Sequence, residues 1–217
     1  MSYLILNNSS SQELKSEQQI SFLGRRPLLL LGSDSNPVLI RQALGSQLEW
    51  ELPLLKGILE GARCVWASKL GKGGAPAATL IRGGKCTVIV AWPEAAQLQA
   101  LCQAAGNDFR LAQLSDCVIS DGKQQFDSLL ALIADPLSLD GDACQVASAS
   151  VDLTHQQEMF MIQLSDWLCQ KARINGLEIY TPADLQKAWL NPSQRPKVEE
   201  IMKPLDSGLL LKDPAAW

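Results

Sequence analysis

The residues most able to do chemistry in this sequence are three polar side chains between an apolar run and a helix start. Ser33, Asp34 and Ser35 follow four leucines at 28–31 and precede Asn36-Pro37, a pair typical of the first residues of a helix. Ligands of open α/β sheets bind at the carboxyl ends of strands, so these three residues form a candidate ligand-binding site. Asp34 would repel a bare anion, which leaves a hydroxyl or a metal-bridged ligand. The alternative is a turn whose polar side chains only start the helix.

His155 and the cysteines are the other residues with intrinsic reactivity. His155 is the single histidine of the sequence, and it follows Thr154 at a predicted helix start, where we expect it to be exposed. No two cysteines have the close C-x₂₋₄-C spacing of zinc, iron–sulfur or redox sites. We therefore expect no catalytic residue, no metal and no cofactor, and reduced thiols typical of a cytoplasmic protein. The cysteines are Cys64, Cys86, Cys102, Cys117, Cys144 and Cys169.

Between positions 61 and 93 the sequence has basic residues and no acidic residue. Glycines at 71, 73, 74, 83 and 84 lie beside most of these cations, and glycine lets backbone N–H groups approach a phosphate. The G-x₄-G-K-[ST] spacing of a Walker A loop is absent. This window predicts a local nucleic-acid patch, and the alternative is a set of solvated loop residues. Its basic residues are Arg63, Lys69, Lys72, Arg82 and Lys85.

The whole-chain composition limits how large such a patch can be. The 217 residues carry a net charge of −4, the sequence pI is about 5.1, and 47% of the residues are hydrophobic. A broad basic surface and a disordered chain are both excluded. No apolar run approaches the roughly 18 residues of a membrane helix, so we expect no membrane partner. The first residues have no basic segment, so we expect no signal peptide.

Strands and helices alternate along 1–136, which predicts an α/β domain with a layered, mixed sheet. Gly83-Gly84 between two β-rich runs predicts a hairpin turn. The pattern predicts strands at 3–6, 28–31, 63–67, 78–81, 86–91 and 117–119. It predicts helices at 11–21, from 37, at 50–59, at 94–105 and around 126–133. The small residues of 137–153 indicate a linker.

The segment 154–217 has a more regular pattern. It predicts a helix from Thr154, a second helix capped by Thr181-Pro182, a third over 194–207, and a strand at 209–212. The stretch TPADLQKAW…VEEIMKPLDSGLLLKD within 157–213 resembles a winged-helix domain. Winged helices often place their third helix in the major groove of DNA. This resemblance implies that Arg195, Lys197 and Lys203 contact DNA.

These observations predict a non-enzymatic, nucleic-acid-associated or regulatory accessory factor of the replication, transcription or mobile-element type. Two alternatives stay open. Six tryptophans could serve as anchors in a protein-assembly or scaffold subunit, which includes a homo-oligomer. An α/β enzyme could use a ligand or metal at Ser33, Asp34 and Ser35.

Overall fold

In the computed structural model, the chain forms two compact units. We call Met1–Arg63, Arg82–Ile133 and Gly208–Trp217 the sheet unit, and Cys64–Ile81 with Ala134–Ser207 the helical unit. Each unit is therefore assembled from segments that are distant in the sequence. The structure describes residues 3–7, 11–14, 22–45, 50–71, 74–120, 125–126, 128–144, 146, 153–172 and 176–214.

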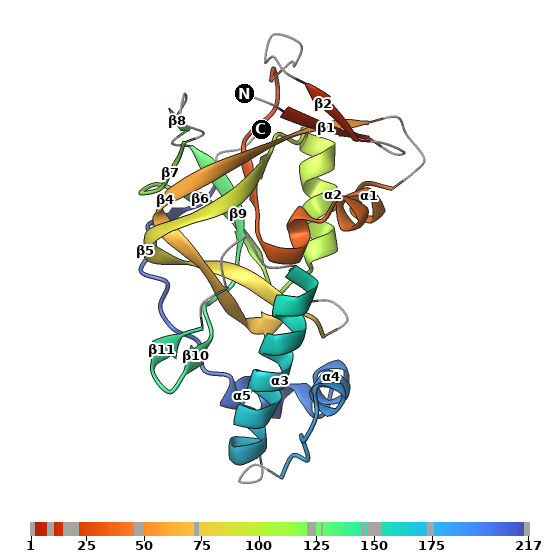
Figure 1. Cartoon of the computed structure of the whole chain (residues 1–217), viewed down its shortest axis with the longest axis vertical. Coiled ribbons are helices and arrows are strands. Elements are labelled where there is room, and N and C mark those ends of the chain that lie inside the picture. Colours follow the sequence, from red (N-terminus) through yellow and green to blue (C-terminus); the bar gives the residue numbers. More distant parts are fainter. Residues whose placement is uncertain are drawn as a thin grey trace. The chain divides into compact units, whose positions relative to one another are not determined.

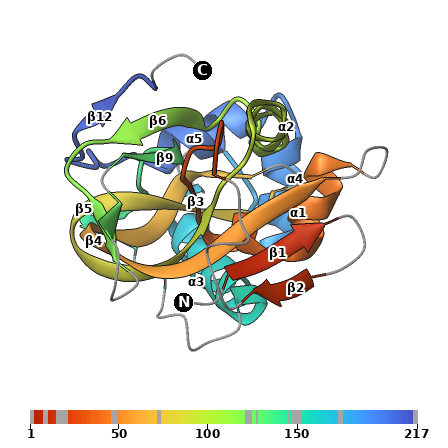
Figure 2. The ribbon, with the colours of Figure 1, turned by 90° about the horizontal axis from the view of Figure 1, so that it is seen from above.

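Ten of the described strands form one sheet in the order β12-β6-β9-β3-β5-β4-β1-β2, with β7 joined to β4 and β8 joined to β7 (Figure 1, and Figure 2 for β3 and β12). The separate pair β10–β11 is a hairpin. The strands are β1 (Tyr3–Asn7), β2 (Ser11–Leu14), β3 (Leu28–Leu30), β4 (Glu51–Leu70), β5 (Pro76–Ala91), β6 (Arg110–Leu114), β7 (Val118–Ser120), β8 (Gln125–Phe126), β9 (Leu129–Ile133), β10 (Ser138–Leu139), β11 (Asp142–Ala143) and β12 (Leu211–Lys212). The helices are η2 (Gly32–Ser35, a 3₁₀ turn), α1 (Pro37–Leu44), α2 (Ala95–Ala105), α3 (Leu153–Ala172), α4 (Pro182–Leu190) and α5 (Arg195–Ile201).

The sheet is mixed, as the sequence predicted. Leu28 of β3 lies opposite Leu130 of β9 in a parallel pair, and Leu29 lies opposite Val90 of β5 in an antiparallel pair. All three residues of β3 are buried, which agrees with the prediction of a strand covered on both faces. The α/β fold class is therefore confirmed.

Local sequence signals set the helix starts of the sheet unit. The Asn36 side chain accepts a hydrogen bond from the Val38 amide and caps α1 at 2.9 Å. Glu94 and Gln97 form a capping box that starts α2, close to the predicted helix at 94–105. Figure 1 shows α1 and α2 side by side. Their apolar faces cover the sheet, because Ile40, Leu98 and Leu101 belong to one buried cluster with Leu28 and Leu30.

The helical unit is built around α3, α4 and α5, which pack against one another. Their inward residues share a core with Trp66 and Leu70 at the end of β4, and the rings of Trp66 and Phe160 stack with centroids 4.7 Å apart. The three helices predicted within 154–207 are therefore present. The third ends at Ile201 rather than at 207, since Pro204 cannot continue it. The strand that follows, β12, pairs with β6, with Leu211 opposite Leu114. The winged-helix resemblance stays a prediction.

Three predicted helices are wrong where the structure describes them, because the described segments form strands. Residues 15–21 of the first of these helices lie outside the described residues. Residues 11–14 form β2, residues 51–59 belong to the long strand β4, and 129–133 form β9. All five residues of β9 are buried, and a short apolar run fits a buried strand and a buried helix equally well. The sheet, rather than local periodicity, decides between them.

The predicted turn at Gly83-Gly84 is also wrong. β5 continues through both glycines, and Figure 2 shows the long curved paths of β4 and β5. The two strands are joined instead around Gly71–Gly74, where the Gly71 amide donates to the Ala75 carbonyl at 2.7 Å. Both glycines have positive φ, at 87° and 82°, so they bend the strand without ending it.

The segment expected to be a linker, 137–153, contains the β10–β11 hairpin. In the described part of the chain, no helix is long and apolar enough to cross a membrane.

Candidate ligand-binding site

A two-residue turn, Asp140-Gly141, projects a carboxylate from the β10–β11 hairpin of the helical unit. Ser138 pairs with Ala143 across the hairpin, and the two turn residues have φ of 55° and 105°. Positive φ at both positions is the geometry for which Asp-Gly is favoured. The Gly141 amide donates to Ser138 Oγ at 3.2 Å. The turn therefore fixes the direction in which the Asp140 side chain leaves the hairpin.

Helix α3 presents an aromatic ring and a cation to this carboxylate. Trp167 and Lys171 are one helical turn apart, so both lie on the same side of α3. The Trp167 indole Nε1 donates to Asp140 Oδ2 at 3.2 Å, and Lys171 Nζ lies 3.8 Å from Asp140 Oδ1. Lys171 Nζ is also 5.8 Å from the centroid of the Trp167 ring. Asp140 thus accepts a hydrogen bond from Trp167 and forms a longer ion pair with Lys171.

The opposite wall comes from the end of α5 and the residues after it. The Ser138 amide donates to the Lys203 carbonyl at 3.1 Å, and Leu137 forms a β-bridge with Pro204. These backbone contacts join the hairpin to the segment that carries Lys203. Ile201 is buried at 8% exposure and supplies an apolar surface.

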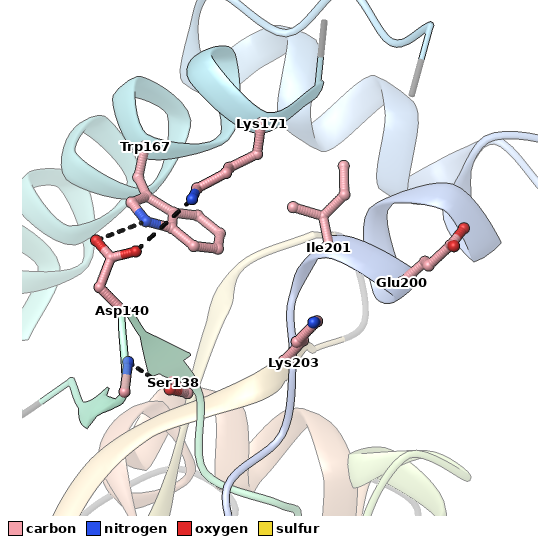
Figure 3. A pocket seen from close by; sticks show the side chains of 8 residues that line it. Ser138, Asp140, Trp167, Lys171, Glu200, Ile201 and Lys203 are labelled. Carbon is pink, nitrogen blue, oxygen red and sulfur yellow. Dashed lines mark hydrogen bonds and ion pairs between the residues drawn. The ribbon is translucent and has the colours of Figure 1, made fainter. Parts of the chain in front are cut away.

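These three segments line an open pocket of about 440 Å³. Figure 3 shows Trp167 and Lys171 on one side, Lys203 across from them, Asp140 on a third side, and Glu200 at the edge beyond Ile201. The volume lies in the range of about 300–1,000 Å³ that is usual for small-molecule sites. Two cations and two carboxylates line it, with Ser138, Gly141, Trp167 and Ile201.

Comparison with known proteins does not assign this pocket. No protein-family model and no curated protein matches the chain. Among solved structures, the solution structure of At3g28950.1 from Arabidopsis thaliana matches at 14% identity, over 71% of this chain and 88% of that one, with a TM-score of 0.38. A likeness at that TM-score carries no functional argument.

The basic residues predicted on the third helix have different surroundings. Glu199 accepts from Arg195 Nε at 2.9 Å and lies 2.8 Å from Lys69 Nζ. The Arg195 guanidinium also lies 4.5 Å from the centroid of the Trp189 ring. Desolvation by burial raises the pKa of Glu199, but the hydrogen bonds and charges of Lys69 and Arg195 outweigh it and hold that pKa below its usual value. Arg195 and Lys69 therefore stabilise the helical unit itself, whereas Lys197 and Lys203 are exposed.

In the sheet unit, Arg63, Arg82 and Lys85 lie on β4 and β5. Arg82 Nε forms an ion pair with Asp116 Oδ2 at 3.4 Å. Arg63 Nε is buried and has no hydrogen-bond partner among the described atoms. Lys72 lies outside the described residues. The predicted patch is thus divided between the two units, with Lys69 in the helical one.

The predicted site at 33–35 forms the 3₁₀ turn η2, at the carboxyl end of β3. The Asp34 amide donates to the Leu31 carbonyl at 3.1 Å, and Ser35 Oγ donates to the Gly32 carbonyl at 2.7 Å. Asp34 is solvent-exposed by accessible surface, yet desolvation by surrounding protein raises its pKa to about 6. Solvent that reaches the carboxyl partly offsets this desolvation. The Ser33 side chain lies outside the described part.

The described cysteines are free thiols. Burial raises the pKa of Cys117 to about 12, to which Asp116 and Cys86 contribute, and burial raises the pKa of Cys144 to about 11. Thiols with such pKa values are poor nucleophiles at neutral pH. Among the described residues, no group of three or more His, Cys, Asp and Glu side chains could hold a metal ion. His155 lies in α3, and its side chain is outside the described part.

Sequence reasoning singled out one residue of the pocket, Lys203, and assigned it to DNA. It missed Asp140, Trp167 and Lys171. A signal for Asp140 was present, because Asp-Gly is a strong indicator of a two-residue hairpin turn. The spacing of Trp167 and Lys171 indicated a shared helix face, but nothing local indicated that the hairpin would face it.

Proposed function

We propose that this protein is a non-enzymatic regulatory accessory protein that binds a small ligand in the pocket of its helical unit. The observation that carries the proposal is the pocket itself. Its lining combines an apolar surface from Trp167 and Ile201 with a few charged groups, as is usual for small-molecule sites.

Part of the site is positioned before any ligand arrives. Asp140 is positioned by its turn and by Trp167, and the backbone of Lys203 is fixed to β10. A preformed site loses less conformational entropy on binding. The same contacts support binding rather than catalysis, because the Asp140 carboxylate is already engaged by a donor and a cation.

The nucleic-acid role stays a prediction. The ion pairs of Glu199 argue against a nucleic-acid role for the two cations that form them. Lys69 and Arg195 already have a carboxylate partner, so a phosphate would have to compete for them. A gel-shift titration of the full chain with duplex and single-stranded DNA at low salt tests that role.

Thermal unfolding of the full chain tests the proposed function. Separate samples contain millimolar amino acids, nucleoside phosphates, sugar phosphates or simple carboxylates. A ligand at a hundred times its Kd stabilises the folded state by about 2.7 kcal/mol, which raises Tm by several degrees.

Lys203→Met and Lys197→Met form the matched pair for this measurement, because both lysines are exposed and only Lys203 lines the pocket. The proposal expects at least one class to raise Tm in the wild type and in Lys197→Met, and to raise it less in Lys203→Met. It is overturned if no class raises Tm, or if the two variants respond alike.

A further inference from the structure

The charges of the pocket are balanced and alternate around its walls. Lys171 and Lys203 lie on opposite sides, with Asp140 between them on one flank and Glu200 at the edge (Figure 3). A polyanion gains little from such a lining, since each lysine is offset by a carboxylate. A ligand that carries both charges finds a partner for each of them.

Both lysines can bind an anionic group. Lys171 Nζ is 3.8 Å from Asp140 Oδ1, which is longer than a hydrogen bond. No ion pair is described for Lys203, which is exposed. Ammonium groups of this kind have three donors each and turn easily toward a carboxylate.

Asp140 can accept a cationic group. Its carboxylate offers about four lone-pair sites, and the described contacts with Trp167 and Lys171 involve one site on each oxygen. Asp140 lies in a tight turn, with φ of 55°, and this turn sets the direction of its carboxylate. An ammonium group could therefore bind without displacing Trp167.

The remaining surface is apolar. Trp167 is half-buried and packs on the core of the helical unit, and Ile201 is buried beside the pocket. An apolar side group of a ligand could cover both. An aromatic ring suits this surface best, because it can pack against the indole at an offset or edge-on.

We propose that the pocket binds a small zwitterion with an apolar side group, namely an aromatic amino acid or a short peptide that ends in one. The carboxylate lies between Lys171 and Lys203, the ammonium group meets Asp140, and the ring covers Trp167 and Ile201. This inference rests on the proposed function, because it names the ligand class of the same pocket.

Three probes with one ring and different charges test the proposal on the full chain. L-phenylalanine carries both charges, phenethylamine only the positive one, and 3-phenylpropionate only the negative one. Calorimetric titration measures their affinities. We expect L-phenylalanine to bind roughly tenfold or more tightly than either analogue, since each analogue leaves one charged partner unused.

Two variants assign the charges. Lys203→Met should lower the affinity for L-phenylalanine about tenfold and leave the affinity for phenethylamine unchanged. Glu200→Gln leaves the hairpin intact. It should lower the affinities for L-phenylalanine and phenethylamine by a smaller factor, and it should not lower the affinity for 3-phenylpropionate. Lys197→Met should bind all three probes as the wild type does.

The outcomes separate the two proposals. If 3-phenylpropionate binds as tightly as L-phenylalanine, the pocket is an anion site and the zwitterion inference is wrong. If none of the probes binds but another class raises Tm in a Lys203-dependent way, the proposed function stands and this inference falls. If no class has any effect, both fall.

Discussion

The Asp140 carboxylate accepts a hydrogen bond from the Trp167 indole nitrogen, and this contact joins the tip of the β10–β11 hairpin to α3. The two residues are 27 positions apart in the sequence. Their contact forms one side of the pocket.

The left-handed backbone of Asp140 leads to a first prediction. Asparagine tolerates φ of 55° and can accept from Trp167, so Asp140→Asn should change the free energy of unfolding by less than about 0.5 kcal/mol. Alanine has neither property, so Asp140→Ala should destabilise the chain by about 1–2 kcal/mol. Urea unfolding of both variants measures the difference. Equal losses would show that backbone conformation and hydrogen bond contribute nothing here.

The Glu199 ion pairs should make stability depend on acid pH. The pKa of Glu199 in the folded state is below its ordinary value of 4.5. Its stabilising effect is therefore complete above that value and is lost as the pH falls through the lower, folded-state pKa. Glu199→Gln should be less stable at neutral pH and should lose less stability on acidification. Glu200→Gln is the control, since no ion pair is described for Glu200. The prediction fails if both variants follow the wild-type pH profile.

Asp34 should make stability change with pH in the opposite direction to Glu199. Its pKa rises from 3.8 to about 6 in the folded state, so the fold retains the proton more tightly than the unfolded chain does. Stability should therefore decrease as the pH rises from about 4 to about 6, and stay lower above that range. Because Asp34 is solvent-exposed, we expect the decrease to be smaller than a fully desolvated carboxyl would give. Asp34→Asn should flatten this part of the profile, and Asp142→Asn, at an exposed position of β11, should not. An unchanged profile in Asp34→Asn would contradict the prediction.

Gly61 should be intolerant of any side chain. Its φ is +92°, and an added Cβ would lie 2.5 Å from the Asp116 carbonyl oxygen. Gly61→Ala should therefore lower the free energy of unfolding by about 2–4 kcal/mol. Gly45 has φ of +76° and open space around it, so Gly45→Ala should cost only about 1 kcal/mol, from backbone strain. Chemical unfolding of the two variants compares them, and a similar loss in both would show that the close approach to Asp116 is relieved at no cost.

Short-range signals were sufficient for several elements of this fold. The Asn36-Pro37 start of α1 and the Thr181-Pro182 start of α4 follow from their caps and from proline at the first helical position. Each depends on atoms within a few residues of one another. The sequence alone was enough to predict them, together with the fold class.

Where tertiary contacts decide, the sequence was ambiguous. The apolar run of β9 and the start of β4 became strands because the sheet offers backbone partners on their flanks. Gly83 and Gly84 bend a strand instead of turning a hairpin, since β5 continues beside β3 beyond them.

The candidate site shows the same division. Asp-Gly at 140–141 and the one-turn spacing of Trp167 and Lys171 can be read from the sequence. Only the folded chain brings Asp140 to Trp167 and sets Lys203 across from both, because that arrangement depends on backbone contacts from 137–138 to 203–204. Conversely, Lys69 and Arg195 were identified by their charge. Arg195 is paired with Glu199 one helical turn away, within α5, and only the tertiary structure brings Lys69 to the same carboxylate.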